Sequence, residues 1–280
     1  MQNVILLFQC DDKKGIVAAL SDFIFKNDGN IITADQYSSD PEGGHFFIRV
    51  EFCIDKPNSD KEALEKAFYP IAHKFNADWK MYYKYESLRM GIFVSELDHC
   101  LVDLLYLWKS GELNVKIPFV ASNHTGHKDI VELYKIPFHY IPANKQDRKE
   151  QELLSLVSGN SDFLVLARYM LLLSGDFLTK YNKDIINIHH SFLPSFKGAD
   201  PYRRAFEKGV KVIGATAHFV TEELDEGPII SQIVEPVSHR ESVDDLIRKG
   251  KNLEKRALSQ AIHNYIDYRI IKYKNKTIVF

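Results

Sequence analysis

The chain has 280 residues, of which 45% are hydrophobic and 26% are charged, and its formal net charge is −2. This composition is typical of a globular protein, and the length favours two domains over one. The nearly neutral charge shows no basic excess that would indicate nucleic acid as the main partner, so we expect no nucleic-acid partner.

Membrane segments and metal sites are not indicated either. The N-terminal apolar run of about five residues lacks the basic and small-residue flanks of a signal peptide. Residues 163–173, the most apolar stretch, contain Arg168 and are far shorter than a membrane span of about 20 residues. Cys10, Cys53 and Cys100 are widely spaced and predict neither disulfides nor a zinc site. We therefore expect a cytoplasmic protein with free thiols and no metal.

The first 85 residues alternate element types in a recognisable order. Strand-like runs and apolar residues at three- and four-residue intervals predict the elements of this segment. They are a strand at 3–9, an amphipathic helix at 16–25, two strands at 31–39 and 45–54 around a DPEGG turn, a second helix at 59–75 and an aromatic strand at 79–85. The order β-α-β-β-α-β is that of a ferredoxin-like unit. We place a domain boundary after residue 85, which gives domains 1–85 and 86–280.

Beyond the boundary, strands alternate with single helices. Strands are predicted at residues 90–95, 115–123, 138–143, 185–190, 210–220 and 229–237, and helices at 97–108, 128–134, 147–157, 202–208 and 242–268. Residues 163–173 are expected to form a buried strand that runs into a helix, and residues 269–280 a hairpin. The alternation predicts a Rossmann-like α/β domain with a mostly parallel sheet covered on both faces.

Polar loops follow several of these strands. They are NIHHSFLPSFKG at 187–198, ARYM at 167–170 and TEELDEGP at 221–228. Open α/β sheets bind ligands at the carboxyl ends of their strands, so we expect the three loops to converge on one crevice.

Asn187, His189 and Asp225 together suit attack on a carbonyl group. The amide and a protonated imidazole stabilise an oxyanion, and the carboxylate orients and deprotonates a nucleophile. No GxSxG elbow is present, so Ser191 is as well explained as a cap. Isolated loop histidines are more often structural, and Asp225 could be one charge of a solvated acidic loop. Adjacent histidines on an extended segment should point to opposite faces, which disfavours a metal site at His189 and His190.

The segments NIHHSFLPSFKGADPYRRAFEKG and GATAHFVTEELDEGPII resemble the folate-dependent formyltransferase family, which carries an N-I-H-x-S-x-L-P loop and a later D-x-G-P-I loop. The resemblance covers residues 89–280. It implies that Asn187, His189 and Asp225 are the catalytic residues. It also implies a pterin-binding segment at LARYM and a set of folate-binding residues: Met170, Leu171, Leu173, Val220 and Glu222. Core packing is the alternative role for Met170, Leu171 and Leu173.

The sequence also indicates which molecule accepts the formyl group. Where the ribonucleotide transferases carry a phosphate-binding loop, this chain has Glu96 and Asp98, which would repel a phosphate. The HHS and FKGADPY sequences and the N-terminal unit are similar to members that use water. This implies hydrolysis of 10-formyltetrahydrofolate to tetrahydrofolate and formate, supplying formate for purine synthesis without a tightly bound cofactor. His190 and Ser191 would support the catalytic loop, with His190 selecting water. The alternatives are transfer to an amine, or a regulatory protein that only binds folate.

The N-terminal sequences CDDKKGIVAAL and NDGNI are similar to the ACT-domain signature. The similarity implies an amino-acid effector, methionine or glycine, at a site framed by Asp12, Gly15, Gly29 and Asn30. These residues serve equally well as turn and cap residues. Because ACT units pair edge to edge, we also expect a homo-oligomer.

Overall fold

The structure of the protein is a computed structural model that describes residues 2–40, 43–54, 61–84, 87–195 and 200–280. The chain forms two compact units. One comprises residues 1–87, 267–271 and 278–280, and the other comprises residues 88–266 and 272–277. The predicted boundary at residues 85–86 lies outside the described residues, as do parts of the DPEGG turn, the second helix and the FKGADPY segment.

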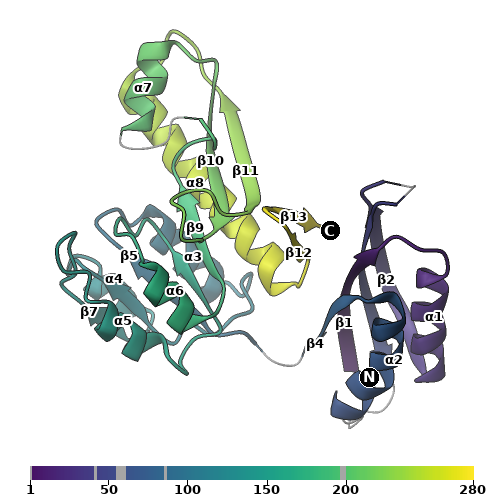
Figure 1. Cartoon of the computed structure of the whole chain (residues 1–280). Helices are drawn as coiled ribbons and strands as arrows, with labels where there is room; N and C mark the ends of the chain where they lie inside the picture. Colours follow the sequence, from purple (N-terminus) through teal and green to yellow (C-terminus); the bar gives the residue numbers. More distant parts are fainter. Residues whose placement is uncertain (1, 41–42, 55–60, 85–86, 196–199) are drawn as a thin grey trace. The chain divides into compact units, whose positions relative to one another are not determined.

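The first unit is the predicted ferredoxin-like βαββαβ fold (Figure 1). Its elements are β1 (Gln2–Asp11), α1 (Ile16–Lys26), β2 (Gly29–Ser38), β3 (His45–Ile54), α2 (Lys61–Phe75) and β4 (Asp78–Tyr83). The strands form an antiparallel sheet in the order β2-β3-β1-β4. The apolar faces of both helices pack on this sheet around Phe8, Phe52 and Phe68. The prediction of this fold is confirmed.

Residues from the end of the chain also belong to the first unit. The Arg49 guanidinium on β3 donates to the carbonyl oxygens of Asp267 and Tyr268, at 3.2 and 3.1 Å. The ring of Tyr268 stacks on that of Tyr82 with centroids 3.9 Å apart. Arg49 can therefore be buried on the sheet face away from the helices without an unsatisfied charge.

The second unit is built on a seven-stranded sheet in the order β11-β10-β9-β8-β5-β6-β7. The strands are β5 (Met90–Val94), β6 (Val120–Ser122), β7 (Phe138–Tyr140), β8 (Phe163–Leu166), β9 (Ile185–His189), β10 (Val212–Phe219) and β11 (Ile229–Pro236). Strands β5 to β9 pair in parallel, and β10 and β11 are antiparallel additions. The predicted mostly parallel sheet is therefore confirmed.

Helices cover both faces of this sheet (Figure 1). They are α3 (His99–Lys109), α4 (Lys128–Leu133), α5 (Glu150–Val157), α6 (Gly175–Tyr181), α7 (Pro201–Lys208) and α8 (Val243–Ile266), and β12 (Ile270–Tyr273) and β13 (Lys276–Val279) form the predicted hairpin. Helices α5 and α6 pack on the face that carries Phe93 and Leu164. On the other face, Tyr265 of α8 contacts Phe163 and Phe219.

Some element boundaries differ from the prediction. Strand β8 does not run into a helix, because Arg168 has a left-handed φ of 64° and α6 begins only where Ser174 accepts a hydrogen bond from Phe177 N. Strand β6 spans three residues of the expected nine, since Pro118 lacks the N–H that a longer ladder would use. Helix α5 begins after Lys149, another left-handed residue.

Among the described residues, no helix combines the length and the apolar character that crossing a membrane requires. Cys10, Cys53 and Cys100 are all free thiols.

Candidate active site

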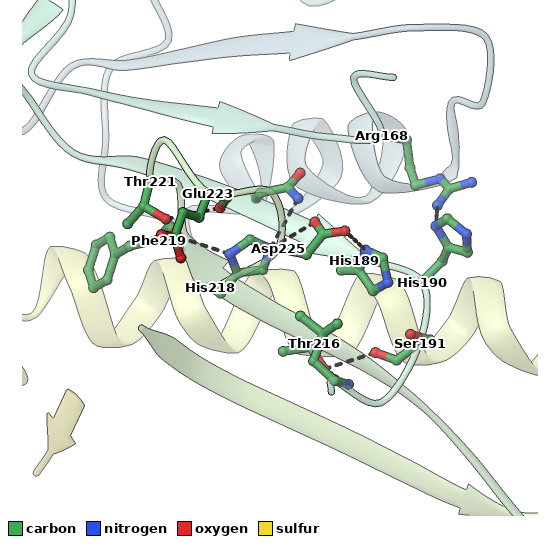
Figure 2. Close-up of polar contacts among 12 residues, drawn as sticks. Arg168, His189, His190, Ser191, Thr216, His218, Phe219, Thr221, Glu223 and Asp225 are labelled. Carbon is green, nitrogen blue, oxygen red and sulfur yellow. Dashed lines mark hydrogen bonds and ion pairs between the residues drawn. The ribbon is translucent and has the colours of Figure 1, made fainter. Parts of the chain in front are cut away.

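The candidate catalytic residues gather where β9 and β10 run side by side. Asn187 on β9 lies directly opposite His218 on β10, and His189 lies opposite Thr216. Residues two apart on a strand share a face, so both pairs project to the same side of the sheet. Figure 2 shows the His189 and His218 rings on either side of Asp225. The strand register thus assembles the site from residues that are distant in sequence.

Asp225 reaches this face from the loop between β10 and β11. Its Oδ2 lies 3.2 Å from His189 Nδ1, and its Oδ1 lies 3.7 Å from His218 Nε2. The residue has a left-handed φ of 56°, a strained conformation that occurs preferentially at functional sites. Two residues later, a Cβ on Gly227 would stand 1.8 Å from the Phe219 carbonyl oxygen. Only glycine fits this close approach, which explains the D-x-G-P spacing.

Hydrogen bonding determines the tautomers at the site. His218 Nδ1 lies 2.9 Å from the Phe219 carbonyl oxygen, so this nitrogen carries a hydrogen and donates it. The other nitrogen, Nε2, lies 3.2 Å from Asn187 Nδ2 and also faces Asp225 Oδ1. Asn187 keeps a second amide hydrogen for another acceptor. His189 Nε2 is buried and has no hydrogen-bond partner among the described residues, so the imidazole also has a free position for a ligand.

The electrostatics keep Asp225 ionised. Burial acts to raise the pKa of Asp225, but its interactions with the His189 and His218 rings outweigh burial and hold the pKa far below its ordinary value. A carboxylate in this state stabilises a positive charge on His189. The site therefore combines an anion, an ionisable imidazole and an amide donor, the set that carbonyl addition requires.

His190 lies beside His189 rather than on the opposite face. The two rings are stacked, with centroids 5.0 Å apart and an interplanar angle of 22°. The expectation of opposite faces is wrong because β9 ends at His189 and the chain leaves the extended conformation there. Arg168 Nη1 contacts His190 Nδ1 on the ring edge (Figure 2). Burial, followed by the charges of Arg168 and His189, lowers the pKa of His190 to about 4.

Ser191 has a structural contact pattern. Its Oγ donates to the Ser195 carbonyl oxygen at 2.8 Å, and its own carbonyl accepts from Thr216 Oγ1 at 2.9 Å. Thr216 Oγ1 in turn accepts from Leu193 N. These bonds tie the loop after β9 to β10, and Ser191 makes them from a buried position. Ser191 thus holds the loop in place.

The residues expected to bind folate lie on two neighbouring segments. Leu171, Leu173 and Val220 are partly buried against the core cluster below α5 and α6. Met170 is 57% exposed, and its backbone N–H donates to Ser95 Oγ at 3.0 Å. A Cβ on Gly175 would stand 2.7 Å from the Glu222 carboxylate, so the loop that carries Asp225 lies against the start of α6.

The four residues of the expected effector site lie apart. Gln2 and Gly29 both pair with Ile54, so β1 and β2 begin at the same end of the sheet. Gly29 and Asn30 are therefore separated from Asp12 and Gly15 by the length of β1, about 30 Å for a ten-residue strand. Asp12 Oδ2 accepts from Ser38 Oγ at 2.6 Å. One copy of the chain does not bring the four residues together.

Sequence reasoning did not identify His218, Arg168 or Glu254 as site residues. His218 had a usable signal, since the period-two spacing of Thr216 and His218 matches that of Asn187 and His189. Glu254 lies with His99 and Cys100 in a group whose possible metal-ligand atoms approach within 4.8 Å in the described part of the chain. Its carboxylate faces the Arg168 guanidinium, at 3.4 Å, which disfavours a bound cation.

Comparisons with known proteins agree with this architecture. The Formyl transferase family model matches residues 88–262, and the ACT domain model matches residues 4–68. Formyltetrahydrofolate deformylase of Bacillus subtilis is 47% identical over 98% of this chain and 93% of its own length. The enzyme of that name from Synechocystis is 46% identical over the full length of both chains.

Solved structures give the same relationship. A formyltetrahydrofolate deformylase from Pseudomonas syringae has a TM-score of 0.95 at 41% identity, covering 100% of this chain and 95% of its own. A glycinamide ribonucleotide transformylase from Symbiobacterium toebii has a TM-score of 0.65 at 29% identity, covering 71% of this chain and 96% of its own. The full-length matches and the two-domain fold show that the chain belongs to the formyltetrahydrofolate deformylase family.

Proposed function

We propose that the chain hydrolyses 10-formyltetrahydrofolate to tetrahydrofolate and formate, using Asn187, His189 and Asp225. The supporting observation is the clustering of these three residues with two free hydrogen-bonding positions, the second Asn187 amide hydrogen and His189 Nε2. Both are suited to the oxygen of a formyl group. The names of the relatives that this chain resembles supply the substrate class.

The reaction begins with attack of a water oxygen on the formyl carbon. A C–O bond forms, and the carbonyl oxygen becomes an oxyanion that accepts from Asn187 and from protonated His189. Asp225 orients the water and takes its proton. Collapse of the tetrahedral intermediate breaks the bond between the formyl carbon and N10, which receives the proton as tetrahydrofolate leaves. The released formic acid loses its remaining proton to solvent as formate, so the sequence needs only side chains, substrate and water.

His190 is the proposed residue that favours water as the acceptor. Its neutral ring stacks on His189 and borders the reacting centre. Glu96 and Asp98 follow β5, where their charges disfavour a phosphorylated amine. The alternative, transfer to an amine, predicts that formate appears only as a minor product.

Product analysis tests the activity. The full chain incubated with 10-formyltetrahydrofolate alone should release one formate per tetrahydrofolate, and added amines should not reduce this ratio. Release that requires an amine, or formylated amine in place of formate, contradicts hydrolysis. A chain that binds the folate without turnover would instead be a regulatory protein. His190→Pro should change the rate or the water-to-amine partition if His190 selects water.

We further propose that residues 1–85 form an amino-acid-responsive domain and residues 86–280 the catalytic domain, in a homo-oligomer. Strand β2 lies at the edge of its sheet, and its central residues are exposed on both faces, a strand edge that another copy can pair with. A site that uses Asp12, Gly15, Gly29 and Asn30 together needs two copies, because one copy separates them. Formate release measured with and without methionine or glycine tests the response.

A further inference from the structure

Behind the catalytic loop lies a buried polar cluster that the proposed reaction does not use directly. It consists of Glu254 on α8, His99 on α3, Tyr202 on α7 and Arg168 after β8, and we call it the Glu254 cluster. Glu254 is 2% exposed. His99 Nε2 lies 2.8 Å from its Oε2, and Tyr202 OH donates to its Oε1 at 2.8 Å. Four separate elements therefore meet at one carboxylate.

A glycine inside helix α8 makes room for this cluster, although glycine is unfavourable in the middle of a helix. Gly250 lies one turn before Glu254 in the middle of α8, where glycine disfavours a helix. A Cβ at Gly250 would stand 2.1 Å from the Tyr202 hydroxyl oxygen and ring. The glycine lets Tyr202 pass over α8 and reach Glu254. Arg168 likewise has a left-handed φ of 64°, which an arginine rarely adopts.

Arg168 links Glu254 to the catalytic loop. Its Nε forms a 3.4 Å ion pair with Glu254 Oε2, and its Nη1 contacts His190 Nδ1. A guanidinium can only donate, so His190 Nδ1 must accept and the ring hydrogen must lie on Nε2. The His190 ring stacks on His189 and also faces the Tyr202 ring, at 6.3 Å between centroids. The ring is thus held in both place and tautomer.

We propose that Glu254 and Arg168 are positioning residues for the reaction: Glu254 anchors the guanidinium, and Arg168 holds His190 as a neutral ring with its Nε2–H free for the attacking water. The inference rests on the hydrolysis proposed above. A buried ion pair contributes little net stability, because desolvation offsets its attraction. Its placement against His190 gives it a different role, since small displacements of catalytic groups have large effects on rate.

The charges around His190 determine how this arrangement responds to pH. Arg168 from the end of β8 and His189 on β9 oppose protonation of the ring, whereas Glu254 on α8 and Asp225 favour it. The Tyr202 hydroxyl on α7 is held by Glu254, and burial acts with that carboxylate to raise the pKa of Tyr202 beyond its ordinary range. Loss of the Arg168 charge should therefore raise the pKa of His190 from about 4.

Two variants test the proposal on the full chain. Glu254→Gln and Arg168→Gln should each lower kcat for formate release about 10- to 100-fold with KM changed less than about threefold. In Arg168→Gln, His190 takes a proton at higher pH than in the wild type. Because the reaction requires the neutral ring, the acid limb of the pH profile of kcat should move to higher pH. A merely structural loss lowers activity without moving this limb.

The chain offers a matched control at the opposite end of the strands. Asp162 precedes β8 and forms an ion pair with Arg89 at 2.6 Å. Asp162→Asn should lower the melting temperature and leave kcat and the acid limb unchanged. Wild-type kcat and acid limb in Glu254→Gln and Arg168→Gln would overturn the proposal, as would equal kcat losses in Asp162→Asn.

A measurement on the wild type covers the case in which the variants do not fold. Nitrogen NMR of the His190 ring should report the neutral Nε2–H tautomer at pH 6, and its titration should fall below pH 5. An Nδ1–H tautomer or a charged ring at pH 6 would overturn the inference. This readout needs no turnover, so it separates failure of the positioning role from failure of the hydrolysis, which would leave wild-type protein without formate release.

Discussion

Two sets of residues that resemblance singles out are arranged in opposite ways. Asn187, His189 and Asp225 come from one strand and a distant loop, yet Asp225 contacts both His189 and His218, Asn187 contacts His218, and His189 is 6% exposed. The four residues of the expected effector site lie at opposite ends of a sheet whose edge strand β2 is exposed. Bond-making chemistry requires desolvated groups in defined positions, and one chain is enough to bring the candidate catalytic set together.

Glycines also have different roles in the two units. In the second unit, Gly227 and Gly250 permit close approaches that bring polar groups together. In the first unit, Gly29 lies against the end of α1, where a Cβ would be 2.8 Å from Ile24 Cγ2, and Gly15 has a left-handed φ of 90°. Those two glycines stabilise a fold rather than assemble a reactive centre.

The largest expected effect is on the reaction itself. Asn187→Ala removes an oxyanion donor and should lower kcat by about 100-fold or more, with little change in stability. Rates of formate release under saturating 10-formyltetrahydrofolate measure this loss. Near-wild-type turnover would show that Asn187 does not serve the oxyanion and would remove the contrast between the two sets.

Gly227→Ala tests whether the loop must approach β10 closely. The new Cβ would clash with the Phe219 carbonyl oxygen, so the loop must shift and carry Asp225 away from His189. We expect kcat to fall roughly 10- to 100-fold. Gly126→Ala is the control, because its Cβ meets no atom within 4 Å and its backbone is not left-handed. Equal rates for both variants would refute the positional argument.

The sequence predicts elements and motifs better than it predicts contacts. The order of strands and helices in both units follows from periodicity, and the N-I-H and D-x-G-P segments single out the candidate catalytic trio. Neither reveals that His218 faces Asn187, because strand register depends on the packed sheet. The stacking of the His189 and His190 rings was not predictable because it depends on where β9 ends. Glu254 was not predictable either, because helix periodicity does not distinguish a buried carboxylate from an exposed one.

Gly29→Ala should affect the first unit through stability alone. The added methyl overpacks against Ile24 and the Phe52 ring, which should lower the free energy of unfolding by about 1–3 kcal/mol. Urea unfolding followed by circular dichroism measures the change. Formate release at temperatures below the unfolding transition should remain close to that of the wild type. A loss of turnover in the folded variant would mean that this glycine also serves the catalytic reaction.

The smallest expected effect concerns the separation of the effector residues. Ile32 is 48% exposed on the edge strand β2, and a lysine there places like charges together when two copies pair along this edge. Ile32→Lys should weaken self-association about tenfold, which corresponds to about 1.4 kcal/mol. Sedimentation measures the association, and formate release per subunit measures the response to methionine or glycine. Because one copy separates Asp12 from Asn30, that response should decline together with association.

A wild-type chain that responds to the amino acid as a monomer would place the whole effector site within one sheet and contradict the two-copy arrangement.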